Sequence, residues 1–418
     1  MFNHPLFHTL KNLRGNVRAC VYTEPLWGIP FNLYSPYTSI YMLALGLTDV
    51  QIGLLTSIGL ILQVFWTVMS GPITDKLGRK RTTLIFDIIS WSIPCLIWAI
   101  AQNFTYFLAA AIVNAVWRVT SNSWQCLLVE DADQKQLVDV FSWVYIAGLL
   151  AAFVSPLTGV LIARFSLVPT IRGLYLLALV MMTTKFVVLN VFATETQIGL
   201  ARMAETRGKS LFDGVRGYPA VFRQIVRTPV MVLMLGLMVV LGISRTVSGT
   251  FWSILVTEKL RIPAEHLAIY PFAKSIVMLL FFFLVMPKLR HSATHKPMIV
   301  GFLGLVLSNV ILISMPAGSY GWLLLATVLE ACSVPLASTL LDTLIVVNVN
   351  AEERARIMAI LYVLVILATS PFGWIAGEMS EINRSLPFVL NIGLFAGGVV
   401  LTFLTGRWTK KEEADAKI

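Results

Sequence analysis

The sequence predicts an all-α integral membrane protein whose twelve transmembrane helices form two pseudo-symmetric six-helix bundles. Of its 418 residues, 57% are hydrophobic and 13% are charged, so the charged fraction is about half that of an average soluble chain. The apolar residues gather in twelve segments, each long enough to cross a bilayer as a helix. Similar residues also recur at one fixed spacing between the first and second halves of the chain.

Helices are the expected spanning elements, because lipid offers no hydrogen-bond partner to an unpaired backbone group. The continuous apolar run at 279–286 also lacks the alternation of a barrel strand. The expected spans are 19–44, 50–71, 83–101, 105–127, 138–163, 171–193, 229–256, 264–287, 297–315, 320–346, 355–377 and 387–406.

The repeated residues relate the two halves of the chain. Pro72 and Pro287 are 215 residues apart, and so are the dipeptides 155–156 and 370–371, both Ser-Pro. Two related six-helix halves in parallel orientation are typical of one large class of membrane transporters. The expected parts are a cytoplasmic N-terminal segment (1–18), a first bundle (19–193), a cytoplasmic central linker (194–228) with a surface helix over 211–226, a second bundle (229–406) and a cytoplasmic tail (407–418).

The basic residues predict the orientation. Most of the 32 Lys and Arg residues fall in the two terminal segments, the central linker and the loops on the same side. The positive-inside rule places these parts in the cytoplasm, within a multi-pass protein of the cell (inner or plasma) membrane. The first 18 residues have no apolar core, so no cleaved signal peptide is expected. The opposite loops hold only Arg164, Arg172, Lys259, Arg261 and Arg384.

The composition excludes a soluble enzyme, and the polar residues argue against a membrane-embedded one. The histidines lie outside the expected spans or, for His266, at the very start of one, and the four cysteines have no metal-ligand spacing. The sequence has no nucleotide-binding loop, so ATP hydrolysis is not expected to drive the protein. No metal or cofactor is expected either. The net charge of +10 reflects the cytoplasmic loops, and no nucleic-acid partner is expected.

The most specific motif of the sequence lies in the loop after the second expected span. It reads GPITDKLGRKRT over 71–82. This loop resembles the G-x-x-x-D-x-x-G-R-[RK] signature of the major facilitator superfamily. The resemblance implies that family's fold and a secondary transporter that works by alternating access around a cavity formed by spans one, four, seven and ten. It also implies a cytoplasmic gate formed by the matching residues, which are Gly71, Asp75, Gly78, Arg79 and Lys80.

Each gate residue has an expected contact. Gly71 is expected to let spans two and eleven approach closely. Asp75 is expected to meet the free N–H groups at the amino end of span eleven, near 352–356. Arg79 and Lys80 are expected to pair with acids of the next cytoplasmic loop, which are Glu130, Asp131 and Asp133.

Two interrupted spans predict the solute site. Three prolines between 25 and 36 break span one, and Gly242 and Gly249 flank Arg245 in span seven. Polar, interrupted helices at matching places in two halves indicate a central substrate site. The alternative is simple helix bending with hydroxyl groups bonded to their own backbone. The expected substrate-binding residues are Asn32, Tyr34, Tyr37, Arg118, Asn122, Lys185, Arg245 and Lys274.

The ionisable residues predict the solute's charge. Four of the expected binding residues are cations near mid-span, and Glu330 is the clearest acid at that depth. Because unpaired charge in a membrane is costly, this imbalance predicts an anionic solute, such as an organic acid or a sugar acid. Arg245 is the best candidate to bind it, since a guanidinium grips a carboxylate or phosphate with two hydrogen bonds. The expected carriers of a coupling proton or other ion are Glu24, Glu330 and Asp342.

Other interpretations remain open. A drug–proton antiporter would export lipophilic compounds along aromatic and methionine-rich walls, although span five lacks the glycine that the antiporter pattern has before its proline. Arg118 is alternatively a structural partner of Glu24. A receptor or scaffold would have little use for four cations at membrane depth. Aromatic residues that either stack on a sugar ring or serve as packing are Trp27, Tyr34, Tyr37, Trp117, Trp124, Trp143 and Trp252.

Overall fold

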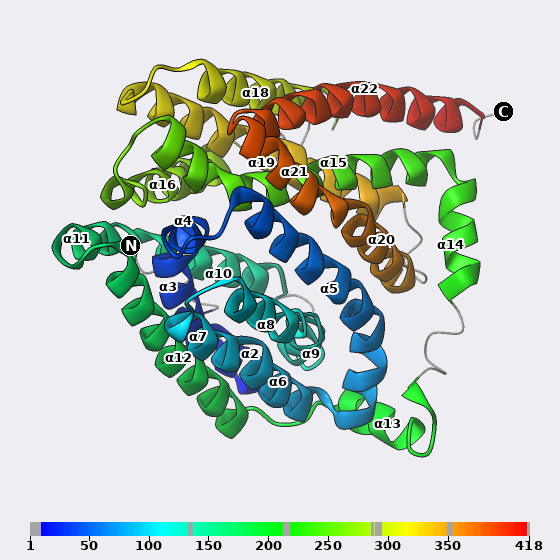
Figure 1. Ribbon diagram of the computed structural model, residues 1–418. Helices are drawn as coiled ribbons and strands as arrows, with labels where there is room; N and C mark the ends of the chain where they lie inside the picture. The colour runs from blue at the N-terminus through cyan, green and yellow to red at the C-terminus, as the bar shows by residue number, and fades with distance from the viewer. Residues whose placement is uncertain are drawn as a thin grey trace. The chain divides into compact units, whose positions relative to one another are not determined.

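All regular structure in the described part of the chain is helical (Figure 1). The computed structural model describes residues 10–132, 137–211, 218–285, 288, 295–348 and 354–415. Within these ranges, ten helices are long and apolar enough to cross a membrane. The two other expected spans, 19–44 and 105–127, are present as runs of shorter helices, because breaks divide them. The predicted fold class is confirmed.

The chain divides into two compact units. Unit 1 comprises Met1–Gly46 and Ile58–Arg216, and unit 2 comprises Leu47–Ser57 and Gly217–Ile418. One long helix, α5 (Asp49–Leu77), therefore contributes its first turns to unit 2 and the rest to unit 1.

Unit 1 holds the first half of the chain. Its α3 packs against α12 and α10, its α6 against α9, and its α7 against α12 and α8 (Figure 1). Besides α5, its helices are α2 (Gly15–Thr23), α3 (Pro25–Tyr34), η1 (Ser35–Tyr37), α4 (Thr38–Ala44), α6 (Arg79–Asp87), η2 (Ile88–Ser92), α7 (Ile93–Ile100), α8 (Phe104–Asn114), α9 (Trp117–Val129), α10 (Leu137–Ala151), η3 (Ala152–Val154), α11 (Pro156–Phe165), α12 (Leu167–Phe192) and α13 (Gln197–Glu205).

Prolines divide the first span, as the sequence predicts. Pro25 begins α3 directly after Glu24, and Pro36 lies in the 3-10 turn η1. A proline has no N–H group to donate to the preceding turn, so it favours the start of a helix or a break. Glu24 therefore lies where α2 ends and α3 begins.

A single π-helical turn, η2, interrupts the third span directly after Asp87. Pro94 follows η2 near the start of α7. Single π turns inside longer helices are frequent at functional sites, because the extra residue changes which side chains share a face. Here the turn includes Trp91.

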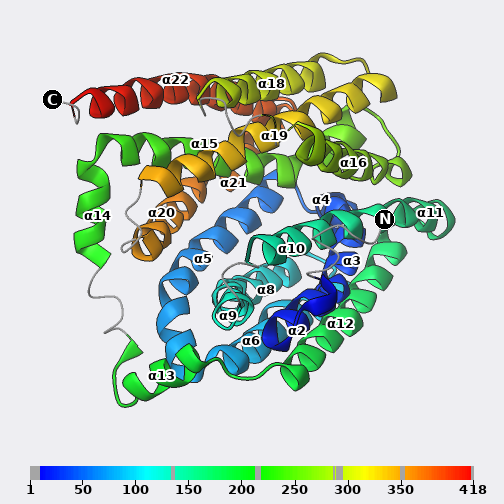
Figure 2. The same cartoon turned by 180° about the vertical axis from the view of Figure 1, so that it is seen from behind.

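Unit 2 holds the second half of the chain. Its α18 packs against α19 and α22, and its α15 packs against α22 and α20 (Figure 2). Its helices are α14 (Tyr218–Arg227), α15 (Pro229–Ile254), η5 (Leu255–Lys259), η6 (Ala264–His266), α16 (Ile269–Leu284), α18 (His295–Ser314), α19 (Tyr320–Asn348), α20 (Arg354–Thr369), α21 (Pro371–Ile382) and α22 (Leu386–Asp415). Of the surface helix expected over 211–226, residues 212–217 lie outside the described ranges, and α14 begins at Tyr218.

The expected interruption of span seven is wrong. Helix α15 is continuous from Pro229 to Ile254 and passes through Gly242 and Gly249. Glycine weakens a helix by about 1 kcal/mol relative to alanine but keeps its N–H group. No proline follows Pro229 within α15, so the backbone hydrogen bonds continue through both glycines.

Within unit 2, the start of span two approaches span eleven closely at Gly53. The start of α5 packs against α21, so that a Cβ atom at Gly53 would clash with the backbone oxygen of Gly373 and lie 3.0 Å from the Cα of Gly377. The Trp374 N–H group donates to Ser57 Oγ at 2.7 Å in the same contact. At Gly71, a Cβ would meet no described atom within 4 Å. Gly71 belongs to unit 1 and span eleven to unit 2, so the packing role predicted for Gly71 stays a prediction.

Gly53→Ala is expected to destabilise the protein by about 1–3 kcal/mol, a typical cost of overpacking against a rigid neighbour. The neighbour here is backbone, which cannot rotate away. Gly59→Ala is the matched control on the same helix, because its Cβ would meet no described atom within 4 Å. It is expected to be neutral or stabilising. Thermal unfolding of the purified variants measures both effects, and equal midpoints for the two would contradict the close contact.

Candidate functional site

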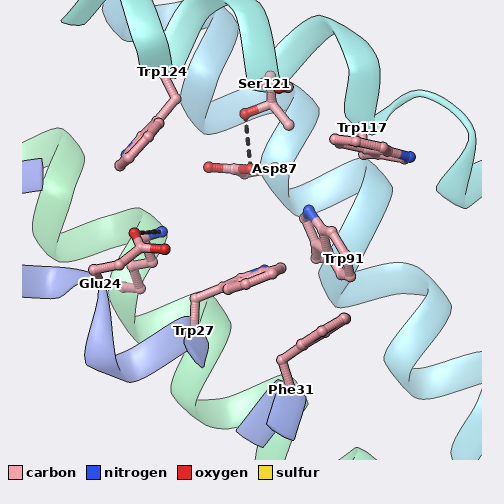
Figure 3. A pocket seen from close by; sticks show the side chains of 10 residues that line it. Glu24, Trp27, Phe31, Asp87, Trp91, Trp117, Ser121 and Trp124 are labelled. Carbon is pink, nitrogen blue, oxygen red and sulfur yellow. Dashed lines mark hydrogen bonds and ion pairs between the residues drawn. The ribbon is translucent and has the colours of Figure 1, made fainter. Parts of the chain in front are cut away.

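Unit 1 contains a cavity of about 390 Å³. We call it the unit 1 cavity. It is bordered by α3, α6, η2, α9 and α12, and Figure 3 shows its side chains from close by. The residues that line it are Glu24, Trp27, Phe31, Asp87, Trp91, Trp117, Thr120, Ser121, Trp124 and Lys185.

Helical spacing explains which side chains of α9 and of the first span line the cavity. On α9, the lining residues are Trp117, Thr120, Ser121 and Trp124, which lie three, four and seven residues apart. Residues at these spacings share one face of a helix. On the first span, Glu24, Trp27 and Phe31 follow the same rule across the start of α3.

An ion pair forms part of the lining of the unit 1 cavity. The Nζ atom of Lys185 lies 2.8 Å from Oε2 of Glu24, and their side chains are only 6% and 15% exposed. Lys185 also lies 5.8 Å from the ring centroid of Trp27 and 5.5 Å from that of Trp124. These distances are within the range of cation–π attraction. The ammonium group is therefore held by one carboxylate and two indole rings.

Asp87 is the second acid of the cavity, and it is buried. It accepts a hydrogen bond from the Thr120 hydroxyl at 2.8 Å. Among the described residues, no cation lies within ion-pair distance of its carboxyl group. Figure 3 shows Asp87 among Trp124, Trp27 and Trp91.

The aromatic rings of the cavity support one another. Trp27 stacks on Phe31 with ring centroids 4.6 Å apart, and it meets Trp91 edge-on at 5.1 Å. Offset stacking and edge-to-face contacts are the favoured arrangements of aromatic pairs. The walls are therefore packed against each other before any solute enters.

The predicted gate loop forms a second cluster of charges in unit 1. Arg79 lies 3.0 Å from Asp75 and binds Glu130 through Nε and Nη2, each at about 3.0 Å. The Arg79 side chain is 5% exposed. The expected pairing of Arg79 with Glu130 is therefore present. Asp133 and residues 350–353 lie outside the described ranges, so the contact expected for Asp75 near 352–356 stays a prediction.

Glu195 completes this cluster and was not predicted. Its carboxylate accepts the backbone N–H groups of Arg79 at 2.8 Å and Lys80 at 3.0 Å, which are free donors at the start of α6. Gly78 precedes them with φ of 84°, and a Cβ there would lie 2.5 Å from Glu195 Oε2. The positive φ favours glycine at this position, and a Cβ would also displace the Glu195 carboxylate from its contacts.

Comparison with known proteins assigns the family. The sequence matches the model of the Major Facilitator Superfamily over residues 27–373. The chain belongs to the Major Facilitator Superfamily. No curated protein matches the chain.

Solved structures of facilitator-superfamily transporters share the fold. The nucleoside transporter NupG matches with a TM-score of 0.71 at 16% identity, over 95% of this chain and 100% of that one. A POT family transporter in complex with 5-aminolevulinic acid gives 0.69 at 15% identity, over 94% and 96%. The human organic anion transporter MFSD10 gives 0.60 at 16% identity, over 95% and 97%. This similarity establishes the fold.

Most of the expected substrate-binding residues of this facilitator-superfamily chain do not line the unit 1 cavity. Asn32 donates to the Gly28 carbonyl of its own helix at 2.8 Å. Tyr34 and Tyr37 are buried, and Tyr34 packs against Tyr175 with ring centroids 4.7 Å apart. Asn32 thus follows the alternative of bonding to its own backbone, and the substrate-binding role of the three residues stays a prediction.

Arg118 and Asn122 lie on α9 but do not line the cavity, although Arg118 contacts the lining residue Trp117. Arg118 donates to Gln63 at 2.9 Å and lies 4.2 Å from the Trp117 ring. Asn122 donates to Thr74 at 3.2 Å. The alternative pairing of Arg118 with Glu24 is not found, because Glu24 binds Lys185.

Four of the residues expected in the site belong to unit 2, and two of them form an ion pair. Lys274 of α16 lies 2.7 Å from Glu330 of α19. Arg245 is exposed near the middle of α15. Asp342 belongs to α19, but its side chain lies outside the described part of the structure.

The charge imbalance that predicted an anionic solute is smaller than the sequence suggested. Lys185 and Lys274 each bind a carboxylate, so two of the four cations are neutralised within their own unit. Sequence reasoning also missed Phe31, Asp87 and Trp91. Asp87 and Trp91 are four residues apart, so helical spacing already places them on one face. The sequence does not show that this face lines a cavity.

Proposed function

We propose that this facilitator-superfamily protein is a secondary active transporter that moves a small organic solute by alternating access, and that the unit 1 cavity receives part of that solute. The observation that carries the proposal is the set of buried Lys185 and Asp87 with partly buried Glu24 in an aromatic cavity. Ionisable groups inside a membrane-spanning bundle are costly, so they are retained chiefly where they serve a solute or ion pathway. A largely apolar cavity with a few polar groups is also the usual form of a small-molecule site.

The two lysine–carboxylate pairs support coupling to a proton. Protonation of Glu24 or Glu330 removes the negative partner of Lys185 or Lys274, and the freed ammonium group then favours a different arrangement. We therefore propose Glu24 and Glu330 as proton carriers, with Asp342 retained as a third candidate. The same logic applies to another coupling ion that would bind the carboxylate.

Glu330→Gln is expected to abolish accumulation driven by a proton gradient while exchange of solute for solute continues. The amide cannot release a proton, but it can still donate and accept hydrogen bonds beside Lys274. Uptake into proteoliposomes, with and without a gradient, measures the first activity, and counterflow measures the second. Glu378→Gln is the control, since Glu378 binds Trp374 within α21. Gradient-driven uptake at the normal rate in Glu330→Gln would assign coupling elsewhere.

The transport function itself is tested with a panel of labelled acidic, neutral and basic solutes in proteoliposomes. Saturable uptake of at least one solute that is lost when Trp91 is replaced with leucine would support the proposal. The absence of saturable uptake across the panel, together with a folded protein, would contradict it.

We also propose that Arg245 binds an anionic group of the solute. An exposed arginine in the middle of a membrane-spanning helix must face water or a polar partner, because lipid tails cannot solvate it. Uptake of an acidic solute that is lost in Arg245→Ala would support an organic acid or sugar acid. The drug–proton antiporter alternative would instead use the indole walls of the unit 1 cavity, and export of a neutral lipophilic compound in the same assay would favour it.

A further inference from the structure

We infer that the unit 1 cavity binds a positively charged group of the solute, an ammonium in an aromatic cage. This inference rests on the proposed function, because it names the chemistry of the solute that the cavity receives. It concerns the group that enters unit 1 and is independent of the anionic group proposed for Arg245.

The charges that line the cavity favour a cation. Its lining includes two carboxylates, those of Glu24 and Asp87, and one ammonium group, that of Lys185. Lys185 binds Glu24 at 2.8 Å, whereas Asp87 accepts a hydrogen bond from Thr120 and has no ion-pair partner among the described residues. When all three groups are ionised, the cavity holds one negative charge more than positive charges. A cation next to Asp87 would balance it.

The aromatic rings of the cavity also favour a cation. Four indole rings and Phe31 line the cavity, and the faces of aromatic rings attract cations, indole most strongly. Lys185 already shows that an ammonium group fits this environment, because its Nζ atom lies 5.8 Å from the Trp27 ring and 5.5 Å from the Trp124 ring. Trp91 and Trp117 also line the cavity, and Trp117 already has the Arg118 guanidinium 4.2 Å from its ring centroid. Trp91 has no such contact with Lys185, so it is the ring proposed to face a second cation.

An anion would meet unfavourable partners here. A carboxylate next to Lys185 would meet an ammonium group whose charge Glu24 already balances at 2.8 Å. It would then lie in the same cavity as the carboxylates of Glu24 and Asp87. Like charges in a poorly solvated site repel strongly, so this arrangement is disfavoured.

Three probes of matched shape test the charge directly. They are choline, its neutral isostere in which a tert-butyl group replaces trimethylammonium, and the anion of tert-butylacetic acid. Binding of each to the purified full chain in lipid nanodiscs is measured by titration calorimetry. We expect saturable binding of choline, and affinity for the neutral probe that is weaker by roughly tenfold or more, the scale of a desolvated cation–π site. Absence of choline binding, or equal or tighter binding of either other probe, would overturn the inference.

Variants locate the bound cation. Asp87→Asn keeps the shape and the hydrogen bond from Thr120 but removes the charge, and it is expected to weaken choline binding by roughly tenfold or more. Trp91→Leu is expected to weaken choline binding as well, while leaving the charge of the cavity intact. Glu205→Gln is the control, because Glu205 is exposed and pairs with Arg202 on α13. Choline binding that is unchanged in both cavity variants would overturn the inference, and thermal unfolding identifies a variant that fails to fold.

The outcome is separable from that of the proposed function. If choline does not bind, but uptake of a neutral or acidic solute is saturable and is lost in Trp91→Leu, the transport function stands and the cation inference fails. If choline binds and no solute is transported, the cavity binds cations and the transport proposal fails.

Discussion

Lys185→Met is expected to destabilise the protein by about 3–5 kcal/mol, the usual cost of removing one partner from a buried ion pair. Lys185 is the only cation that lines the unit 1 cavity among the described residues, and its side chain is 6% exposed. Without it, Glu24 loses its ion-pair partner, and no described residue that lines the cavity balances the carboxylates of Glu24 and Asp87. We also expect transport to be lost.

The double variant Glu24→Gln with Lys185→Met separates the ion pair from simple loss of packing. If the pair is the cause, the double variant is more stable than the sum of the two single changes predicts, by at least about 1 kcal/mol. Thermal and denaturant unfolding of the purified variants measure the difference. Lys209→Met is the control, because Lys209 is exposed in the linker. A Lys185→Met variant as stable as this control would contradict the buried pair.

The fold could be predicted from the sequence because its main cause is local. Each spanning helix requires a long apolar run, and the prolines near Glu24 mark the one expected break that the structure contains. The helical stripe of Trp117, Ser121 and Trp124 is also visible in the sequence. Which neighbour that stripe faces is not visible, because amphipathic spacing is the same for a cavity wall and for helix packing.

The partners of the charged residues could not be predicted, because they lie far apart in the chain. Glu24 and Lys185 belong to α2–α3 and α12, and Lys274 and Glu330 belong to α16 and α19. A count of charges by depth treated these lysines as unpaired, and so it overestimated the demand for an anionic solute. Distances between side chains were required to correct it.

The sequence also does not show which glycines lie at close contacts between helices. Gly78 was recognised from its motif, and its positive φ and the nearby Glu195 explain its place there. Gly71 matches the same motif but has open space at its Cβ, whereas Gly53 lies outside the motif and meets backbone. A motif identifies which residues recur together, but the contact surface of a long helix is set by the helices that it packs against.

Arg79→Met tests the charged cluster of the gate loop, which consists of Asp75, Arg79, Glu130 and Glu195. Arg79 binds Asp75 and Glu130 with a side chain that is 5% exposed, and Glu195 holds the backbone at the same turn. Removing the guanidinium leaves three carboxylates close together, so we expect a loss of about 3–5 kcal/mol. Arg79→Lys is expected to fall between this variant and the native protein, because lysine keeps the charge but lacks the two-pronged geometry that binds Glu130.

Arg81→Met is the matched control for Arg79→Met, since it removes the same charge from an exposed position two residues along α6. Surface changes of this kind usually alter stability by less than about 0.5 kcal/mol. Unfolding midpoints measure the stabilities, and uptake into proteoliposomes measures the gate. If the loop also acts as a gate, Arg79→Lys should lower the transport rate by a larger factor than its loss of folded protein explains. Transport that falls only in proportion to the folded fraction would assign the cluster a purely structural role.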